Sequence, residues 1–213
     1  MKNLFTIFVS PEETFKRVRD KSKTAWLIPF ILLIVISLAS IFLQMPVIEQ
    51  TAKDSLQVSG IADSATVDTV VAGATIGAIV MSPISIAAVT FLGALLYMLL
   101  NLIVRGEAKY MQLVTMVSYA ALPGTLGGLI TSIIIFATDA QSLTEVSLSL
   151  AALVSDKTST LYHLLSLANP FGIWGLALYV IGAAVMMKRP RKTVGMWIIG
   201  TWLVFSLGSL LLV

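Results

Sequence analysis

Side chains that could do acid–base or metal chemistry are rare in the apolar runs of this sequence. His163 is its one histidine, near the end of an apolar run and without a carboxylate close to it in sequence. Such an imidazole could bind a metal or relay a proton, but alone near a membrane surface it is better interpreted as a hydrogen-bonded interfacial residue. The apolar runs hold no Asp, Glu, Lys or Arg. Because coupled transporters and proton pumps place such groups inside the membrane, neither class is favoured.

Motifs of known enzyme classes are also missing. The sequence contains no HExxH, GxSxG, Walker A or GxGxxG pattern, and no Ser/Lys or Asp/Asp pair at catalytic spacing in its apolar runs. With no cysteine, thiolate catalysis, disulfides and Cys-ligated metals are excluded. We therefore predict no catalytic, metal-binding or cofactor-binding residue, no cofactor and no enzyme activity. An intramembrane metal-dependent or lipid-modifying enzyme is the least favoured interpretation.

The composition is that of an integral membrane protein. Of the 213 residues, 57% are hydrophobic and 12% are charged, and the mean hydropathy is +0.94. The formal net charge is only +3, and the basic residues cluster beside apolar runs. This pattern indicates membrane orientation and not nucleic-acid binding.

The apolar runs predict an all-α polytopic membrane protein, a bundle of five transmembrane helices with a short amphipathic N-terminal helix. One run, 70–104, has no charge over its 35 residues, which is about 52 Å of helix and too long for one straight span. We expect a break at Ser82-Pro83. The predicted spans are about 26–45, 83–104, 111–137, 161–187 and 194–213, with an extra apolar helix at 70–82 that bends or re-enters the membrane.

Residues 1–25 form a basic segment ahead of the membrane domain, which we place at 26–213. Ser10, Pro11 and Glu13 form the pattern of a capping box, so a helix should begin there. Phe15 and Val18 fall on one face and the basic residues mostly on the other. We expect the segment to lie in the cytoplasmic headgroup region and to bind anionic lipid. The alternative is a solvated basic flank that only fixes orientation.

The distribution of charge predicts the orientation. With the N-terminus inside, twelve of the fourteen Lys and Arg residues lie on the inner side, and only Lys53 and Lys157 lie in outer loops. The outer loops then hold seven of the eleven acidic residues. We therefore predict a multi-pass protein of the cytoplasmic (inner) membrane with a cytoplasmic N-terminus and, after five spans, an extracytoplasmic C-terminus.

The run from Arg105 to Ile130 is the expected centre of the bundle, because its polar turn and its proline-glycine break need neighbouring helices in hydrocarbon. Pro123 should kink the helix and free the carbonyl of Tyr119. The pair Gly124 and Gly128 should allow another helix to approach that kink. A packed kink is favoured over a hinge or a lined cavity.

Asn101 is a polar side chain near the inner end of the second span. It can hydrogen-bond across helices, an interaction worth about 1 kcal/mol in membranes. A structural bond is favoured over a substrate contact.

Three local patterns resemble the Yip (Ypt-interacting protein) domain family, in its bacterial branch. They are SPEETF at residues 10–15, Gly106 followed by YAALP at 119–123, and NPFGIW at 169–174. In this order on five predicted spans, they extend the resemblance from about residue 5 to 210. The resemblance implies a five-helix membrane protein with a cytoplasmic N-terminus, which agrees with the charge distribution.

Eukaryotic members of that family act in vesicle traffic and contact Rab-type GTPases through a long N-terminal region. Only about 25 residues precede the first span here, so GTPase binding is not carried over. Bacterial relatives resemble accessory proteins, some of them associated with ABC-type exporters. The candidate structural or functional positions are Asn101, Gly106, Tyr119, Pro123, Gly124, Gly128, Asn169 and Pro170.

Two functions stay open at this point. The first is a non-enzymatic membrane accessory or scaffold protein that assists a membrane transport complex, with a membrane-protein partner such as an ABC-type transporter and with anionic lipid. The second is a passive permease or small-molecule exporter with a cavity near Tyr119, Pro123 and Asn169. Association of the chain with itself is also open.

Overall fold

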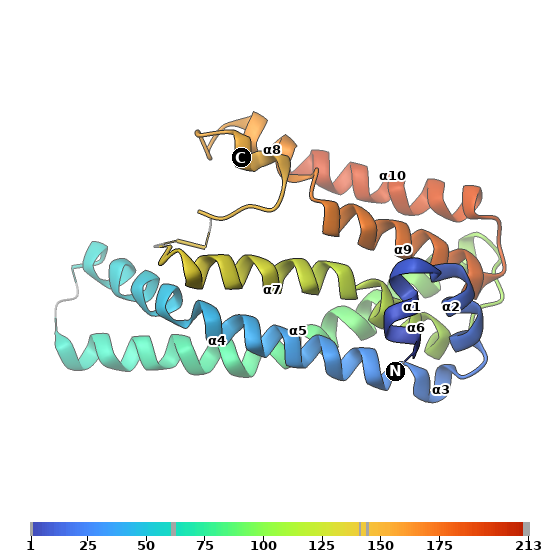
Figure 1. Cartoon of the computed structure of the whole chain (residues 1–213), viewed down its shortest axis with the longest axis horizontal. Helices are drawn as coiled ribbons and strands as arrows, with labels where there is room; N and C mark the ends of the chain where they lie inside the picture. The colour runs from blue at the N-terminus through green and yellow to red at the C-terminus, as the bar shows by residue number, and fades with distance from the viewer. Residues whose placement is uncertain (1, 61–62, 141, 144, 211–213) are drawn as a thin grey trace.

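The computed structural model describes residues 2–60, 63–140, 142–143 and 145–210, and the regular secondary structure of these residues is all helical (Figure 1). This is the predicted all-α class. The helices are α1 (Lys2–Val9), α2 (Pro11–Arg19), α3 (Ser22–Ala25), α4 (Leu27–Val58), α5 (Ser64–Ile103), α6 (Tyr110–Ala120), α7 (Leu122–Ala137), a 3-10 turn (Leu150–Leu153), α8 (Thr160–Ser166), α9 (Pro170–Met187) and α10 (Arg191–Ser209).

Four helical stretches of the described chain are long and apolar enough to cross a membrane. They are Lys23–Val58, Ala65–Ile103, Tyr110–Ala137 and Pro170–Met187. The fifth predicted span, 194–213, is not among them, and its last three residues lie outside the described part. It falls in α10, whose first turn carries Arg191 and Lys192, and these charges lower its hydropathy. Helix α10 runs back along α9 (Figure 1).

Helices α4 and α5 correct two predicted boundaries. Pro46 lies inside α4, which continues to Val58, and Pro83 lies inside α5, so 70–82 is no separate helix. A proline removes one backbone hydrogen bond, and packing against a neighbouring helix compensates for it. The two helices pack antiparallel and extend past the end of α7 (Figure 1), and the hydroxyls of Ser37 and Ser82 are 2.8 Å apart beside Pro83.

The third and fourth predicted spans both contain an interruption. Between α6 and α7 the helix is interrupted at Ala121, two residues before Pro123, where the sequence predicted a kink. The fourth span was predicted as one helix, 161–187, but it is divided into α8 and α9. Asn169 precedes a proline and has an extended backbone (φ −93°, ψ 120°), because the proline ring disfavours the helical conformation of the residue before it.

The N-terminal segment folds as a helical hairpin, α1 and α2, packed on the bundle. Helix α2 begins at Pro11 as predicted, although the Ser10 side chain makes no capping hydrogen bond. Phe15 and Val18 are completely or almost completely buried, at 0% and 1% exposure, and α2 packs against α9 and α6. The expected apolar face is therefore covered by the protein itself and not by lipid headgroups.

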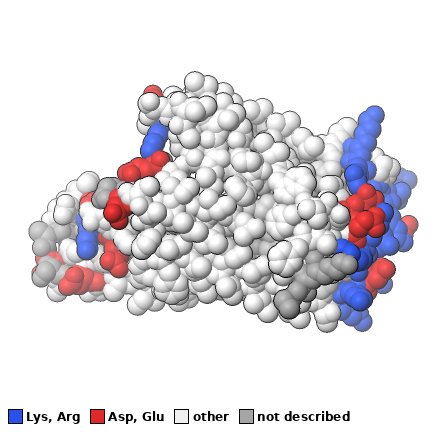
Figure 2. All heavy atoms as spheres, in the orientation of Figure 1, with Lys and Arg blue, Asp and Glu red and all other residues white. Residues whose placement is uncertain are grey.

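Charged side chains gather at the two ends of the molecule and leave the middle uncharged (Figure 2). We call the end with α1–α3 and the turns 104–109 and 188–190 the basic end, and the opposite end, with the tips of α4 and α5 and the segment 138–159, the acidic end. Helix α6 lies in the centre, and residues 113–120 are all buried. Of the run 105–130 that was expected at the centre, the part at 113–120 in α6 is thus buried, whereas Arg105, Gly124 and Gly128 are exposed.

Candidate interaction surfaces

Asn101 closes the turn between α5 and α6 at the basic end. Its side chain is 3% exposed. Its Oδ1 accepts a hydrogen bond from the backbone N–H of Ala108 at 3.1 Å, and its Nδ2 donates to the carbonyl of Ala108 at 3.3 Å. This is the role of a structural bond within the turn, and a buried backbone group needs such a partner.

Gly106 lets the same turn approach the end of α9. A Cβ there would overlap the Asn101 amide and lie 2.8 Å from the Cβ of Met187. The N–H of Glu107 donates to the carbonyl of Met187 at 3.1 Å. The residue before the glycine, Arg105, has a left-handed backbone (φ 54°), and so has Lys188 in the facing turn (φ 52°). The two turns therefore interlock through their backbones.

Ion pairs join these turns to each other and to α2. Lys188 Nζ lies 2.7 Å from Glu107 Oε2, and the hydrogen bond from Lys188 lowers the pKa of the Glu107 carboxyl. Glu12 pairs with Lys16 at 3.0 Å and also with Arg191. The hydrogen bond from Lys16, with further attraction by Arg191, lowers the pKa of Glu12. Exposed pairs of this kind contribute little energy individually, but they link three segments at one end.

The α1–α2 hairpin fills a gap that a glycine opens in α9. A Cβ on Gly182 would lie 2.6 Å from Met116 Cγ and 2.8 Å from Phe15 Cζ. The absence of a side chain therefore allows the aromatic ring to pack between α6 and α9. Buried polar atoms also join the hairpin to itself: Thr14 Oγ1 donates to Thr6 Oγ1 at 2.8 Å.

Tyr119 and Pro123 lie in the packed core and not in an open cavity. Tyr119 is 3% exposed, and Asn3 of α1 is a hydrogen-bond partner of its hydroxyl. Pro123 is buried at the start of α7. The structure therefore brings Tyr119 to the N-terminal hairpin, a contact across more than a hundred residues that no local pattern indicates.

A lateral groove of about 440 Å³ runs between α7, α9 and α10. Gly124, Gly128 and Asn169 line it together with Trp202. A Cβ on Gly124 or Gly128 would meet nothing within 4 Å, whereas one on Gly127 would lie 2.8 Å from the Phe171 ring. The Gly127 face thus packs on α9, whereas no helix of the described residues packs against the predicted small-residue face of Gly124 and Gly128.

Asn169 and Pro170 form the start of α9 at one side of this groove. Asn169 Oδ1 accepts hydrogen bonds from the backbone N–H groups of Phe171 at 2.9 Å and Gly172 at 3.3 Å. Pro170 occupies the first helical position, where its missing N–H costs nothing. Both residues therefore fix where the helix begins.

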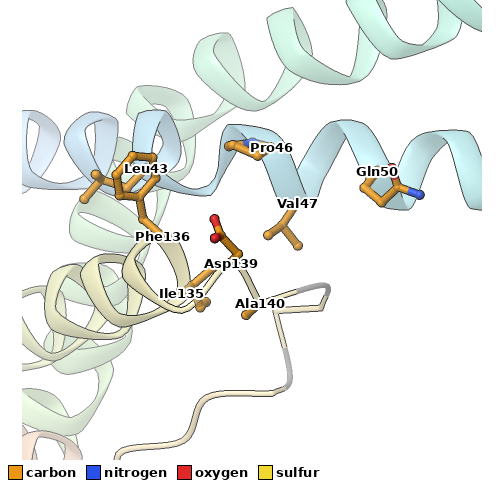
Figure 3. Close-up of a pocket in the computed structure, with 8 residues that line it drawn as sticks. All are labelled: Leu43, Pro46, Val47, Gln50, Ile135, Phe136, Asp139 and Ala140. Carbon is orange, nitrogen blue, oxygen red and sulfur yellow. The ribbon is translucent and has the colours of Figure 1, made fainter.

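A smaller cavity of about 230 Å³ lies near the acidic end, between α4 and the end of α7. In Figure 3 the Asp139 carboxylate points toward α4, between Phe136 and Val47. Asp139 itself has a left-handed backbone (φ 48°).

Among the residues that the structure describes, no three His, Asp or Glu side chains gather as metal ligands would. His163 lies on α8 with its ring 5.7 Å from that of Tyr162.

The comparisons with known proteins agree with the sequence patterns. A family model for the Yip1 domain matches residues 5–213. No curated protein and no solved structure matches the chain. The match covers nearly all of the chain, from α1 to the end of α10, so this helical membrane protein belongs to the Yip1 domain family.

Proposed function

We propose that this protein is a non-enzymatic accessory or scaffold protein of a membrane, which receives a transmembrane helix of a partner protein in the groove between α7, α9 and α10. The partner belongs to a membrane transport complex, and an ABC-type transporter is the class that we expect. The observation that carries the proposal is the unoccupied face of Gly124 and Gly128. Small residues allow helix backbones to approach closely, and close packing drives helix association in lipid.

The proposal includes a topology with five crossings and the basic end in the cytoplasm. Helix α10 runs antiparallel to α9 along its length, and the basic end carries most Lys and Arg residues. A reporter that is active only in the cytoplasm should work at the N-terminus and fail at residue 213. The reverse result would contradict this topology.

Crosslinking from the groove tests the partner directly. A photo-crosslinking residue at Thr131, which lines the groove, should yield one adduct of defined mass in native membranes. Filling the groove by Gly128→Leu should abolish that adduct while the protein still accumulates. Gly77→Leu is the matched control, because its Cβ also meets nothing within 4 Å but lies on α5.

The outcomes of that experiment separate the alternatives. An adduct whose partner is a transporter subunit supports the proposal, and one of twice the chain's mass identifies a second copy of the chain instead. Repeated recovery of the protein alone, with crosslinking before mild-detergent extraction, contradicts it. The permease alternative requires one cavity near Tyr119, Pro123 and Asn169. Tyr119 and Pro123 are buried, and Asn169 lines the groove that we assign to the partner helix, so we do not extend the proposal to transport by this chain.

A further inference from the structure

A second groove, at the basic end, has the chemistry of a phosphate-binding site. It measures about 640 Å³ and lies between the α2–α3 segment and the start of α6. Four cationic side chains line it, from Arg19, Lys21, Lys23 and Lys109, against one carboxylate, from Asp20. The only ion pair that the described part of the chain forms within this set joins Arg19 to Asp20 at 3.5 Å. The amines of the three lysines are therefore available to an anion.

The walls of this groove are held at a fixed separation. Gln112 bridges them, because its Nε2 donates to the carbonyl of Arg19 at 3.2 Å and its Oε1 accepts from the N–H of Lys109 at 2.8 Å. Arg19 also donates to the carbonyl of Val185 on α9 at 3.4 Å. These hydrogen bonds link Arg19 to α6 and α9, so the segment that carries the cations is attached to the bundle.

Two aromatic side chains indicate the depth of the groove relative to the membrane. The indole of Trp26 donates to the carbonyl of Lys23 at 3.1 Å, and the hydroxyl of Tyr110 donates to the carbonyl of Phe91 at 3.0 Å. The Trp26 ring lies 5.6 Å from that of Phe91. Tryptophan and tyrosine prefer the headgroup level of a membrane, and Leu27–Val58 starts directly after Trp26.

We propose that this groove binds the headgroup of an anionic phospholipid, with the lysines of residues 21, 23 and 109 and Arg19 around its phosphate. A soluble phosphate compound would share the charge chemistry, but the acyl chains of a lipid also match the apolar surface below, where Met111 completes the lining. The inference needs the protein to be in a membrane, and it does not depend on the proposed protein partner.

Lipid binding to the full chain in neutral detergent tests the site without an anionic surface. Native mass spectrometry should detect phosphatidylglycerol bound in preference to phosphatidylcholine. Replacing Lys21, Lys23 and Lys109 together by Gln should weaken phosphatidylglycerol binding by about a hundredfold, since each nearby cation contributes about fivefold. The matched control replaces Lys16, Arg105 and Lys192 by Gln, the same charge change at the same end outside the groove, and should keep the preference.

Three results would overturn the proposal. They are equal binding of the two lipids by the unmodified protein, an equal loss in the control triple variant, and displacement of the lipid by millimolar inorganic phosphate, which would identify a site for a soluble phosphate. Unfolding temperatures of both triple variants without lipid should match, so that a folding defect is recognised as such. A failed search for a protein partner leaves this measurement unaffected.

Discussion

The two ends of the bundle are built in different ways. At the basic end, the N-terminal hairpin and two turns meet on the main core, which includes Phe15, Met116 and Met187. At the acidic end, α4 and α5 extend past α7 (Figure 1), and Val47, Ile135 and Ala140 form a separate small buried cluster. The basic end is thus fixed by the hairpin and two turns packed on the main core, whereas the acidic end has a small buried cluster between α4 and the end of α7.

This difference indicates where the protein can present a defined surface. A binding site needs side chains held by their surroundings, and both the Gln112 bridge and the Asn101 turn lie at the basic end. The described residues of the acidic end that form the buried cluster lie apart from the main core, and we expect this end to open at lower free energy. The following substitutions compare the two ends, from the largest expected effect to the smallest.

Removing the aromatic ring of the hairpin should have the largest effect. Phe15→Ala leaves a cavity between α2, α6 and α9 and should lower the free energy of unfolding by about 3–5 kcal/mol. Phe5→Ala is the control in the same hairpin, because that side chain is 75% exposed. Thermal unfolding in detergent measures both. Equal effects would show that the hairpin does not pack as described.

The second largest difference should come from adding one methyl group, which should lower the free energy of unfolding near the basic end but not in α5. Gly182→Ala inserts a Cβ 2.6 Å from Met116 Cγ and should cost about 1–3 kcal/mol. Gly77→Ala, on α5 beyond Pro83 from the basic end, meets nothing within 4 Å and should be neutral or slightly stabilising, since alanine is the better helix former. The same unfolding measurement applies, and a neutral Gly182→Ala would contradict the close contact of α6 and α9.

Removing a polar side chain should matter more at the basic end as well. Asn101→Ala leaves the N–H and carbonyl of Ala108 without their partner and should cost about 1–2 kcal/mol. Gln44→Ala removes one bond, from Nε2 of Gln44 to Ser132 Oγ at 2.6 Å, and should cost about 0.6 kcal/mol. If Gln44→Ala lowers the free energy of unfolding more than Asn101→Ala does, the greater importance of polar contacts at the basic end is contradicted.

The smallest effect is a pH dependence at the basic end. The hydrogen bond from Lys188 lowers the pKa of Glu107 below its ordinary 4.5. Its stabilisation is therefore present above that ordinary value and is lost as the pH falls through the lowered one. Glu107→Gln should make the stability of the protein less dependent on pH between about 5 and 3. An unchanged slope in that range would show that the pair is not formed.

The prolines show what local sequence patterns can predict. Pro123 was predicted to kink the third span, and the helix is interrupted beside it at Ala121. The boundary at Pro170, where Asn169 caps α9, was not predicted. A break was expected at Ser82-Pro83, yet Pro83 lies inside the continuous helix α5. Pro46, just after the first predicted span, likewise lies inside α4. The difference is the antiparallel packing of α4 on α5, which local composition does not contain.

The candidate surfaces show the same limit. The side-chain period of the N-terminal segment identified Phe15 and Val18 as an apolar face, but not what covers it, since the gap at Gly182 lies far away in sequence. The Gly124 and Gly128 pair was identified as a contact face from its spacing. Whether a helix of the same chain covers that face depends on the positions of α9 and α10. These positions follow from the three-dimensional fold and not from local spacing.

Hydrogen exchange in lipid nanodiscs tests the account most directly, because it compares both ends in one experiment. The account predicts that the amides of α2, residues 14–18, are protected nearly as strongly as those of α9, while residues 145–159 exchange rapidly. If α2 instead exchanges as fast as 145–159, the hairpin is not part of the bundle. The basic end would then not be the fixed platform on which the lipid site depends.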